Sequence, residues 1–193
     1  MQQEFNYDVI SGVDSNGNPK NILVDSGGSV KFSSGLAYES AATITRAANT
    51  TAYTANDVYG TVFELANIGA SGGYVFLSSL DIIFNITALP SGMGTFAVYL
   101  YSATPPSAIT DNLPYSLGSG DRETIITLNG LILIASLARG GGSVVAESLN
   151  INQLLKLAIG STSLWGYLTT AAFTPAANSE TATIRARDRK SVV

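Results

Sequence analysis

The sequence predicts an all-β protein, an antiparallel two-sheet sandwich that is jelly-roll-like and carries an extended N-terminal arm. Apolar and polar residues alternate with a period of two in many short segments rich in valine, isoleucine, threonine and aromatic residues. Clusters of glycine, proline, asparagine and serine separate these segments. The nearest approach to a helix is "NQLLKLAI" at 152–159, which has no cap and no second amphipathic turn, so it favours a strand or a single helical turn.

The clearest strand is "TFAVYLY" at 95–101, in which Phe96, Val98 and Leu100 share one face and the tyrosines take the other. The segments "TVFELANI" at 61–68 and "TATIRAR" at 181–187 alternate in the same way. Further strands are expected at 5–10, 20–25, 29–33, 41–46, 74–78, 80–87, 125–128, 130–136, 143–148, 153–159 and 163–169. Short, evenly spaced strands in one chain favour a sandwich with Greek-key crossings.

The chain is expected to have three parts. Residues 1–40 are small, polar and rich in turn signals, which predicts an extended N-terminal arm with short strands. Residues 41–187 form the β-sandwich domain, and residues 188–193 a C-terminal tail. Within the domain, 102–122 is a long segment with three prolines, and loops of that length in compact domains tend to be functional or flexible.

The composition favours protein partners. Only 12% of the 193 residues are charged, so much of the surface is neutral and partly apolar, which is typical of an oligomer or of a bound partner. The net charge of −4 argues against direct nucleic-acid binding. The N-terminus lacks the pattern of a signal peptide, and the most apolar run, 128–138, is too short to cross a bilayer, so a soluble protein without a membrane partner is expected.

No catalytic residue is expected, because the chain contains neither histidine nor cysteine. The stretch "GASGG" at 69–73 matches the G-x-S-x-G pattern of serine hydrolases, but Ser71 has no histidine base and a strand-like segment follows it. A glycine-rich turn is therefore predicted there, without a function for Ser71. Asp121 and Glu123 are the closest carboxylate pair, and a loop with local Asp–Arg pairing explains them without glycosidase chemistry. We expect no cofactor and no enzyme.

A calcium site is an alternative for "DSNGNPKNILVD". Asp14, Asn16, Asn18 and Asp25 stand at positions 1, 3, 5 and 12 of an EF-hand loop. Pro19 stands where the sharp turn needs glycine, so a β-turn with Asx hydrogen bonds is favoured and no metal site is predicted.

Four aromatic residues form a candidate binding or interface surface: Tyr99, Tyr101, Trp165 and Tyr167. The strand that contains Trp165 and Tyr167 has two apolar faces, which favours burial against a neighbouring subunit. The alternative is a platform on which sugars or bases stack.

Several segments resemble a known class of proteins. The opening "SGVDSNGNPKNILVDSGGSV" resembles the N-terminal arms of tailed-bacteriophage structural proteins. The segments "LANIGASGGYVFLSSLDIIF", "LPSGMGTFAVYLYSATPPSAITDNLPYSLGSGDRE" and "TSLWGYLTTAAFTPAANSETATI" resemble a phage virion-protein family found among head genes. The resemblance implies a virion structural role as a capsid cement or decoration protein. It further implies the major capsid protein as partner, a homodimer or homotrimer, and a place on the capsid surface after synthesis in the bacterial cytoplasm.

The residues that contact a partner protein are predicted on physical grounds and not from the resemblance. The arm is expected to bind by strand addition or draping, and the basic end of the chain is a second candidate. The residues concerned are Phe5, Tyr7, Ile22 and Val24 in the arm, and Arg185, Arg187, Arg189 and Lys190 near the C-terminus. The alternative function is a tail or fibre-associated β-sandwich domain that binds host-surface carbohydrate through the four aromatic residues.

Overall fold

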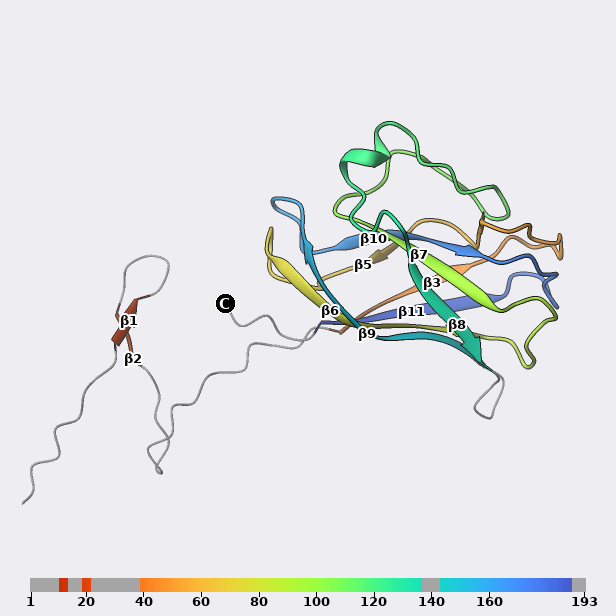
Figure 1. Ribbon diagram of the computed structural model, residues 1–193, viewed down its shortest axis with the longest axis horizontal. Helices are drawn as coiled ribbons and strands as arrows, with labels where there is room; N and C mark the ends of the chain where they lie inside the picture. The colour runs from red at the N-terminus through yellow and green to blue at the C-terminus, as the bar shows by residue number, and fades with distance from the viewer. Residues whose placement is uncertain (1–10, 14–18, 22–38, 137–142, 189–193) are drawn as a thin grey trace, which may run out of the picture. The chain divides into compact units, whose positions relative to one another are not determined.

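The computed structural model describes residues 11–13, 19–21, 39–136 and 143–188 (Figure 1). The chain divides into two compact units, Met1–Gly35 and Leu36–Val193. In the first unit, β1 (Ser11–Val13) and β2 (Pro19–Asn21) form an antiparallel hairpin. The arm contacts predicted at Phe5, Tyr7, Ile22 and Val24, the strands predicted at 5–10 and 29–33, and the calcium ligands Asp14, Asn16, Asn18 and Asp25 all lie outside the described residues.

The second unit contains a nine-stranded antiparallel sheet. Its strands follow the order β3-β11-β6-β9-β8-β7-β10-β4, and β5 also pairs with β10 (Figure 1). A single 3₁₀ turn, η1 (Asp121–Glu123), is the only helical element among the described residues. The strands are β3 (Glu39–Thr45), β4 (Asp57–Val58), β5 (Phe63–Leu65), β6 (Tyr74–Phe84), β7 (Thr95–Tyr101), β8 (Leu131–Ser136), β9 (Val144–Lys156), β10 (Leu164–Thr170) and β11 (Thr181–Asp188).

The predicted all-β, antiparallel class is confirmed, and the sheet is curled into a half-barrel. Strand β8 pairs with β7 on one side and β9 on the other, so the hydrogen bonding is continuous through what the sequence predicted as two separate sheets. At the opposite end of the ladder β3 comes close to β5, and the Ser40 hydroxyl donates to the Ala66 carbonyl at 2.7 Å. The strand pairing therefore describes one continuous curled sheet.

Two long strands replace four expected ones. The predicted strands at 74–78 and 80–87 are joined in β6, and those at 143–148 and 153–159 are largely joined in β9. The break that the sequence suggested is a β-bulge, where the register shifts between Leu77 and Ser79. Opposite it, Asn150 and Asn152 take positive φ values of 60° and 52°. Since asparagine tolerates this conformation, polar residues here bend a strand rather than end it.

One predicted strand is absent, and one short strand was not predicted. The segment 125–128 is not a strand, since Ile125 makes only an isolated bridge to Tyr101. The short strand β4 was not predicted, because two residues carry no visible alternation. The segment "NQLLKLAI" is no helix, and its first five residues end β9.

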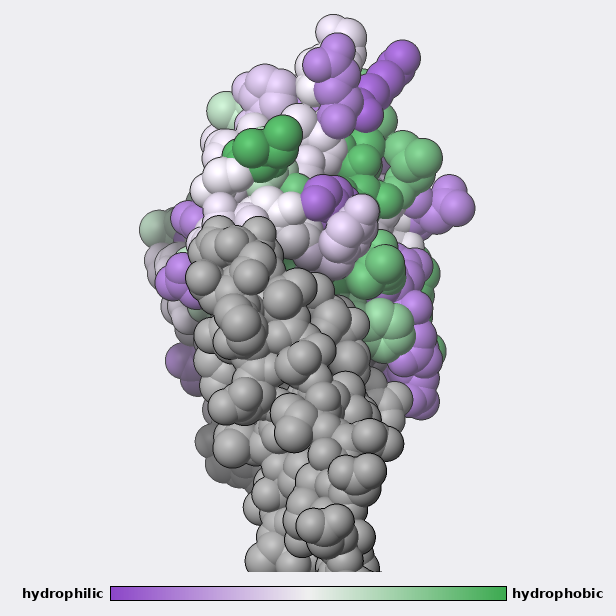
Figure 2. Space-filling view, turned by 90° about the vertical axis from the view of Figure 1, so that its left-hand side faces the viewer, coloured by the Kyte–Doolittle hydropathy of each residue, from purple (hydrophilic) through white to green (hydrophobic). Residues whose placement is uncertain are grey.

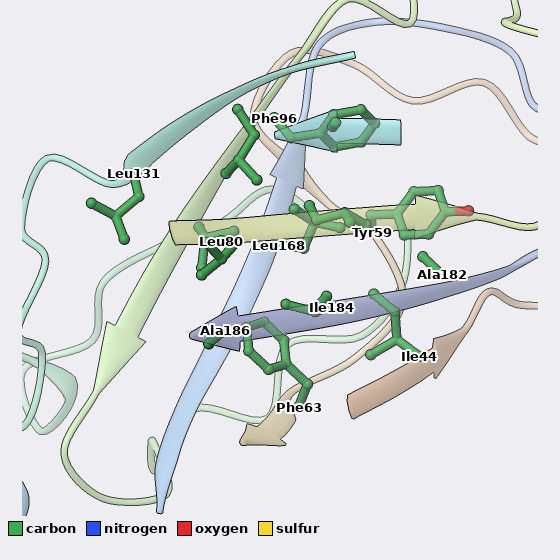
Figure 3. Packing of buried hydrophobic residues seen from close by; sticks show 14 of the residues in the cluster. Ile44, Tyr59, Phe63, Leu80, Phe96, Leu131, Leu168, Ala182, Ile184 and Ala186 are labelled. Carbon is green, nitrogen blue, oxygen red and sulfur yellow. The ribbon is translucent and has the colours of Figure 1, made fainter. Parts of the chain in front are cut away.

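The hydrophobic core fills the concave side of the curled sheet. Figure 3 shows side chains from both halves of the sheet pointing toward one another, among them Ile44, Leu80, Phe96, Leu168 and Ile184. All five are buried, and they come from β3, β6, β7, β10 and β11. Burying one such side chain contributes about 1.5–3 kcal/mol to the free energy of folding. The alternating apolar residues that predicted the strands therefore also stabilise the sheet.

Candidate functional site

The outer face of the sheet carries exposed apolar side chains on three neighbouring strands. Since alternate residues of a strand point to opposite faces, these side chains lie opposite the core. Ile134 lies beside Glu147 across the β8–β9 ladder, and Leu149 is the next outward residue along β9. We call this set the outer apolar stripe, and its members, each between 52% and 64% exposed, are Tyr74, Ile132, Ile134, Leu149 and Leu154.

The other half of the outer face is charged and internally paired. Arg185 Nε lies 3.1 Å from Asp81 Oδ2, and Arg187 lies 3.4 Å from Asp81 Oδ1 and 3.2 Å from Glu39 Oε2. Two of the four basic residues predicted as contacts thus lie within β11 and have carboxylate partners. Arg189 and Lys190 lie outside the described residues.

The four predicted aromatic residues do lie side by side, because Trp165 pairs with Tyr101 and Tyr167 with Tyr99 in the β10–β7 ladder. The long segment 102–127 covers part of this face (Figure 1). Tyr101 and Tyr167 are each only 1% exposed, and Tyr115 of the segment stacks on Tyr99 with ring centroids 4.2 Å apart. These aromatic side chains therefore contact a loop of their own chain, whereas Trp165 is half-buried at the margin.

The phenols in this cluster are held in their neutral form. The Tyr101 and Tyr115 hydroxyls lie 2.5 Å apart, and Tyr167 donates to the carbonyl of Ser107. Burial raises the pKa of Tyr101 to about 12, and burial likewise raises the pKa of Tyr115 and of Tyr167. Ionising these groups would place a charge under the loop, which desolvation opposes.

Asp121 joins distant parts of the segment 102–127 by hydrogen bonds. It does not face Glu123 across a cleft, as the two carboxylates of a glycosidase would. Its carboxylate accepts hydrogen bonds from the Ser107 hydroxyl at 2.5 Å, the Ser107 amide at 3.1 Å and the Gly118 amide at 2.9 Å. Burial by itself raises the pKa of Asp121, but these hydrogen bonds outweigh it, so the pKa lies below its usual value. Glu123 is exposed. The local structure gives Asp121 a positioning role within its loop.

Trp165 faces an open hollow of about 480 Å³. The hollow lies between the start of the loop after β7 and the turn that leads from β9 to β10. Figure 2 views the end of the molecule where β9 runs to β10 and shows apolar residues among polar ones on this surface. The lining residues are Ser102, Ala103, Ala158, Ile159, Gly160, Ser161, Thr162, Ser163 and Trp165.

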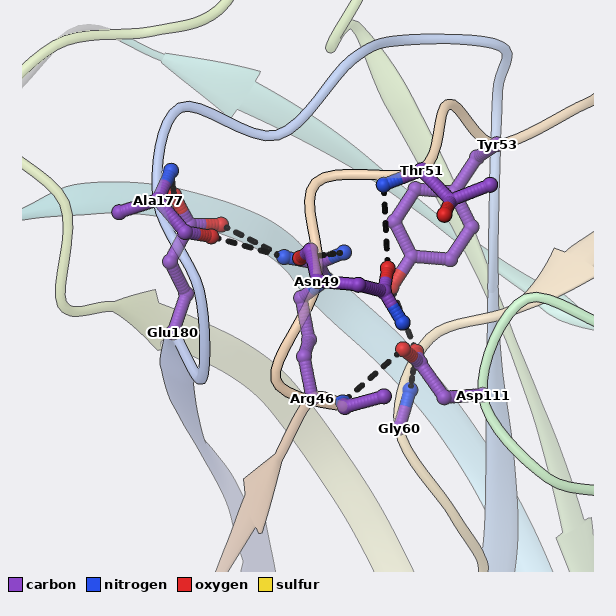
Figure 4. Close-up of polar contacts among 9 residues, drawn as sticks. Arg46, Asn49, Thr51, Tyr53, Gly60, Asp111, Ala177 and Glu180 are labelled. Carbon is purple, nitrogen blue, oxygen red and sulfur yellow. Dashed lines mark hydrogen bonds and ion pairs between the residues drawn. The ribbon is translucent and has the colours of Figure 1, made fainter.

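A buried polar network, which sequence analysis missed, joins three loops at the other end of the strands (Figure 4). Arg46 Nε donates to the Tyr53 hydroxyl at 2.6 Å, and this hydroxyl donates to Asp111 Oδ1 at 2.5 Å. Arg46 also pairs with Glu180 at 3.5 Å and donates to the Ala177 carbonyl at 3.1 Å. The four side chains are scattered between positions 46 and 180, so no local spacing could have indicated them.

The glycine-rich stretch at 69–73 is a turn, as predicted. The amide of Gly73 donates to the Ala70 carbonyl at 2.9 Å, and Gly72 has a positive φ of 61°. The strand β6 begins at Tyr74, where a nucleophile elbow would need a helix. Ser71 is exposed at the tip of this turn.

The described residues contain neither a metal-binding cluster nor a membrane-spanning helix. No group of three or more carboxylates in this part of the chain is arranged to hold a metal ion. No helix among the same residues is long and apolar enough to cross a membrane.

These features place the chain in a structural class, that of curled all-β domains. Its outer face carries an apolar stripe, and buried polar contacts hold its loops in place. No model of a known protein family matches the chain, and no curated protein sequence matches it. The resemblance to phage virion proteins thus depends on the sequence segments alone.

Proposed function

We propose that this chain is a non-enzymatic phage virion structural protein that binds and stabilises the capsid exterior as a cement or decoration protein. The observation that carries the proposal is the outer apolar stripe, because an exposed row of large apolar side chains on one sheet face is typical of a protein contact surface. The two halves of the curled sheet would act as the two layers of a jelly-roll-like core. The major capsid protein is the proposed partner, with a second copy of the chain at a symmetry position.

The energetics of such a contact are favourable. Covering a half-exposed leucine or isoleucine contributes about 1 kcal/mol, so the stripe adds several kcal/mol before the cost of association. The paired charges beside it need no new partner, because Arg185 and Arg187 already contact Asp81. A protein that binds only the assembled capsid stabilises that state by mass action.

The arm supports the same proposal. Met1–Gly35 forms a compact unit of its own, and its described part is a short hairpin. A polar segment of this kind has little core of its own, so its backbone donors and acceptors are suited to strand addition on a neighbouring subunit.

The stripe is tested by charge insertion. The double variant Ile134→Glu, Leu149→Glu places two carboxylates in the proposed contact, and it should abolish co-sedimentation with phage capsids that lack the protein. Ile159→Glu is the matched control, because Ile159 is 99% exposed but lies outside the stripe. Far-ultraviolet circular dichroism and the thermal transition show whether each variant is folded. A folded double variant that binds capsids like the control contradicts the proposal.

The location on the particle is tested by copy number. Gel densitometry of purified virions against the major capsid protein should give hundreds of copies of this chain. A handful or a few dozen copies would instead place it on the neck or tail.

A further inference from the structure

The hollow beside Trp165 has the chemical character of a small ligand site. Its volume is about 480 Å³, and it is open to solvent rather than enclosed, so a ligand would bind against its wall and stay partly exposed. Among the described residues that line it, none is charged, and four carry a hydroxyl group. A half-buried indole forms part of the wall. A neutral ligand with both apolar and hydrogen-bonding surfaces matches this lining.

We propose that the Trp165 hollow binds a neutral saccharide. A pyranose ring presents an apolar C–H face, which stacks on an indole, and a rim of hydroxyl groups, which hydrogen-bond to polar side chains. Trp165 supplies the stacking surface, and the hydroxyls beside it supply the polar contacts. A cationic or anionic ligand would find no opposite charge among the lining residues, so charged sugars should bind less well.

Three of the four hydroxyl groups in the hollow are held in place by hydrogen bonds within the protein. Ser161 Oγ accepts from the Ser163 amide at 3.0 Å and donates to the Ser163 carbonyl at 3.2 Å. Thr162 donates to the side chain of Asn67 at 3.2 Å, and Ser102 donates to the Thr124 carbonyl at 3.2 Å. Because their protons are engaged, these oxygens face a ligand mainly as acceptors. They are therefore arranged to receive hydroxyl protons from a sugar without reordering.

The structure narrows the site to one aromatic side chain. Tyr101 and Tyr167 are covered by the segment 102–127, and Tyr99 is stacked on Tyr115. Trp165 alone among the four predicted aromatics lines the hollow. The saccharide site is separate from the outer apolar stripe and does not depend on the capsid contact, so either proposal can fail without the other.

The chain's one tryptophan makes the test direct, because all of its tryptophan fluorescence comes from Trp165. Neutral oligosaccharides (maltohexaose, cellohexaose and N-acetylchitohexaose) are titrated into the full chain, and a neutral and anionic glycan array extends the panel. At least one neutral glycan should shift Trp165 emission in a saturable way, and its sulfated form should bind at least tenfold more weakly. No saturable response to any neutral glycan overturns the proposal, as does preferential binding of anionic glycans.

Variants locate the binding. Trp165→Ala should weaken it at least tenfold by calorimetry, and Trp165→Phe should retain part of it. Ala103→Arg fills the hollow from its rim without changing Trp165, so it keeps the proposal testable if Trp165→Ala does not fold. Tyr74→Ala, an exposed aromatic residue outside the hollow, is the matched control. Unchanged affinity in a folded Trp165→Ala or Ala103→Arg variant overturns the assignment, and co-sedimentation with capsids should be unaffected in both.

Discussion

At the scale of single residues, Arg46 is the most constrained charge in the described part of the chain. Its side chain is fully buried and contacts Tyr53, Glu180 and the carbonyls of Asn49 and Ala177. The guanidinium also lies 5.0 Å from the centre of the Tyr53 ring. A buried cation is stable only while these partners compensate its lost hydration.

Removing that cation should therefore destabilise the fold strongly. Arg46→Met leaves Glu180 and the Tyr53–Asp111 pair without their partner, and the free energy of unfolding should fall by about 3–5 kcal/mol. The control Arg187→Met removes a half-exposed cation that pairs with Glu39 and Asp81. Because Arg185 still pairs with Asp81, the loss should stay below about 1 kcal/mol. Urea denaturation at neutral pH measures both. Equal losses in the two variants would show that burial of Arg46 does not decide its contribution.

The glycine-rich turn offers a second test at this scale. Gly72 has a φ of 61°, which costs a residue with a Cβ about 1–2 kcal/mol, whereas Ser71 is exposed and makes no demand on its side chain. Gly72→Ala should lower the thermal transition, and Ser71→Ala should leave it unchanged. If Ser71→Ala abolished a function of the folded protein, the turn interpretation of this stretch would be wrong.

At the scale of elements, the segment 102–127 packs over β7 and β10 and is held there by hydrogen bonds and buried side chains. Asp121 holds the segment from within, and tyrosines from both sides fill the space beneath it. The buried phenols link this arrangement to pH. Since the pKa of each is raised in the folded state, the native protein retains protons that the unfolded chain loses above about pH 10.

From neutral pH, stability should therefore be constant up to about pH 10 and decline at higher pH, because the unfolded state binds fewer protons there. Denaturant unfolding between neutral pH and about pH 12 measures the decline. Tyr115→Phe removes one of the phenols and should make the slope shallower by up to about 1.4 kcal/mol per pH unit. A slope that is identical in the variant would mean that Tyr115 ionises as freely in the folded protein as in the unfolded chain.

Alternation along the sequence predicts strands well where one face is core and the other is open. It located both ends of β7 correctly, and those of β8, β10 and β11 to within one residue. It failed at the bulge opposite Asn150, because a polar residue that bends a strand resembles one that ends it. It also selected Trp165 and Tyr101 together, although the loop that follows Tyr101 covers that side chain. Alternation shows which face a side chain takes but not what lies on that face.

At the scale of the whole molecule, one sheet serves two purposes. Its concave side is filled by apolar side chains from both halves, so the domain Leu36–Val193 contains a complete core of its own. Its outer side carries the apolar stripe and, beside it, arginine and carboxylate side chains that form ion pairs with one another. Because the core does not need the stripe, substitutions in the stripe can change binding without unfolding the domain.

The division into two units leads to a prediction for the arm. Deleting residues 1–35 removes the first unit and leaves every strand of the nine-stranded sheet, so the thermal transition of the remaining domain should stay within a few degrees of the full chain. If the arm adds a strand to a neighbouring capsid subunit, the truncated protein should bind capsids at least tenfold more weakly. Co-sedimentation over a range of protein concentrations measures the difference. Unchanged binding by the folded truncated protein would assign the whole contact to the domain, whereas a lost thermal transition would show that the arm contributes to the fold.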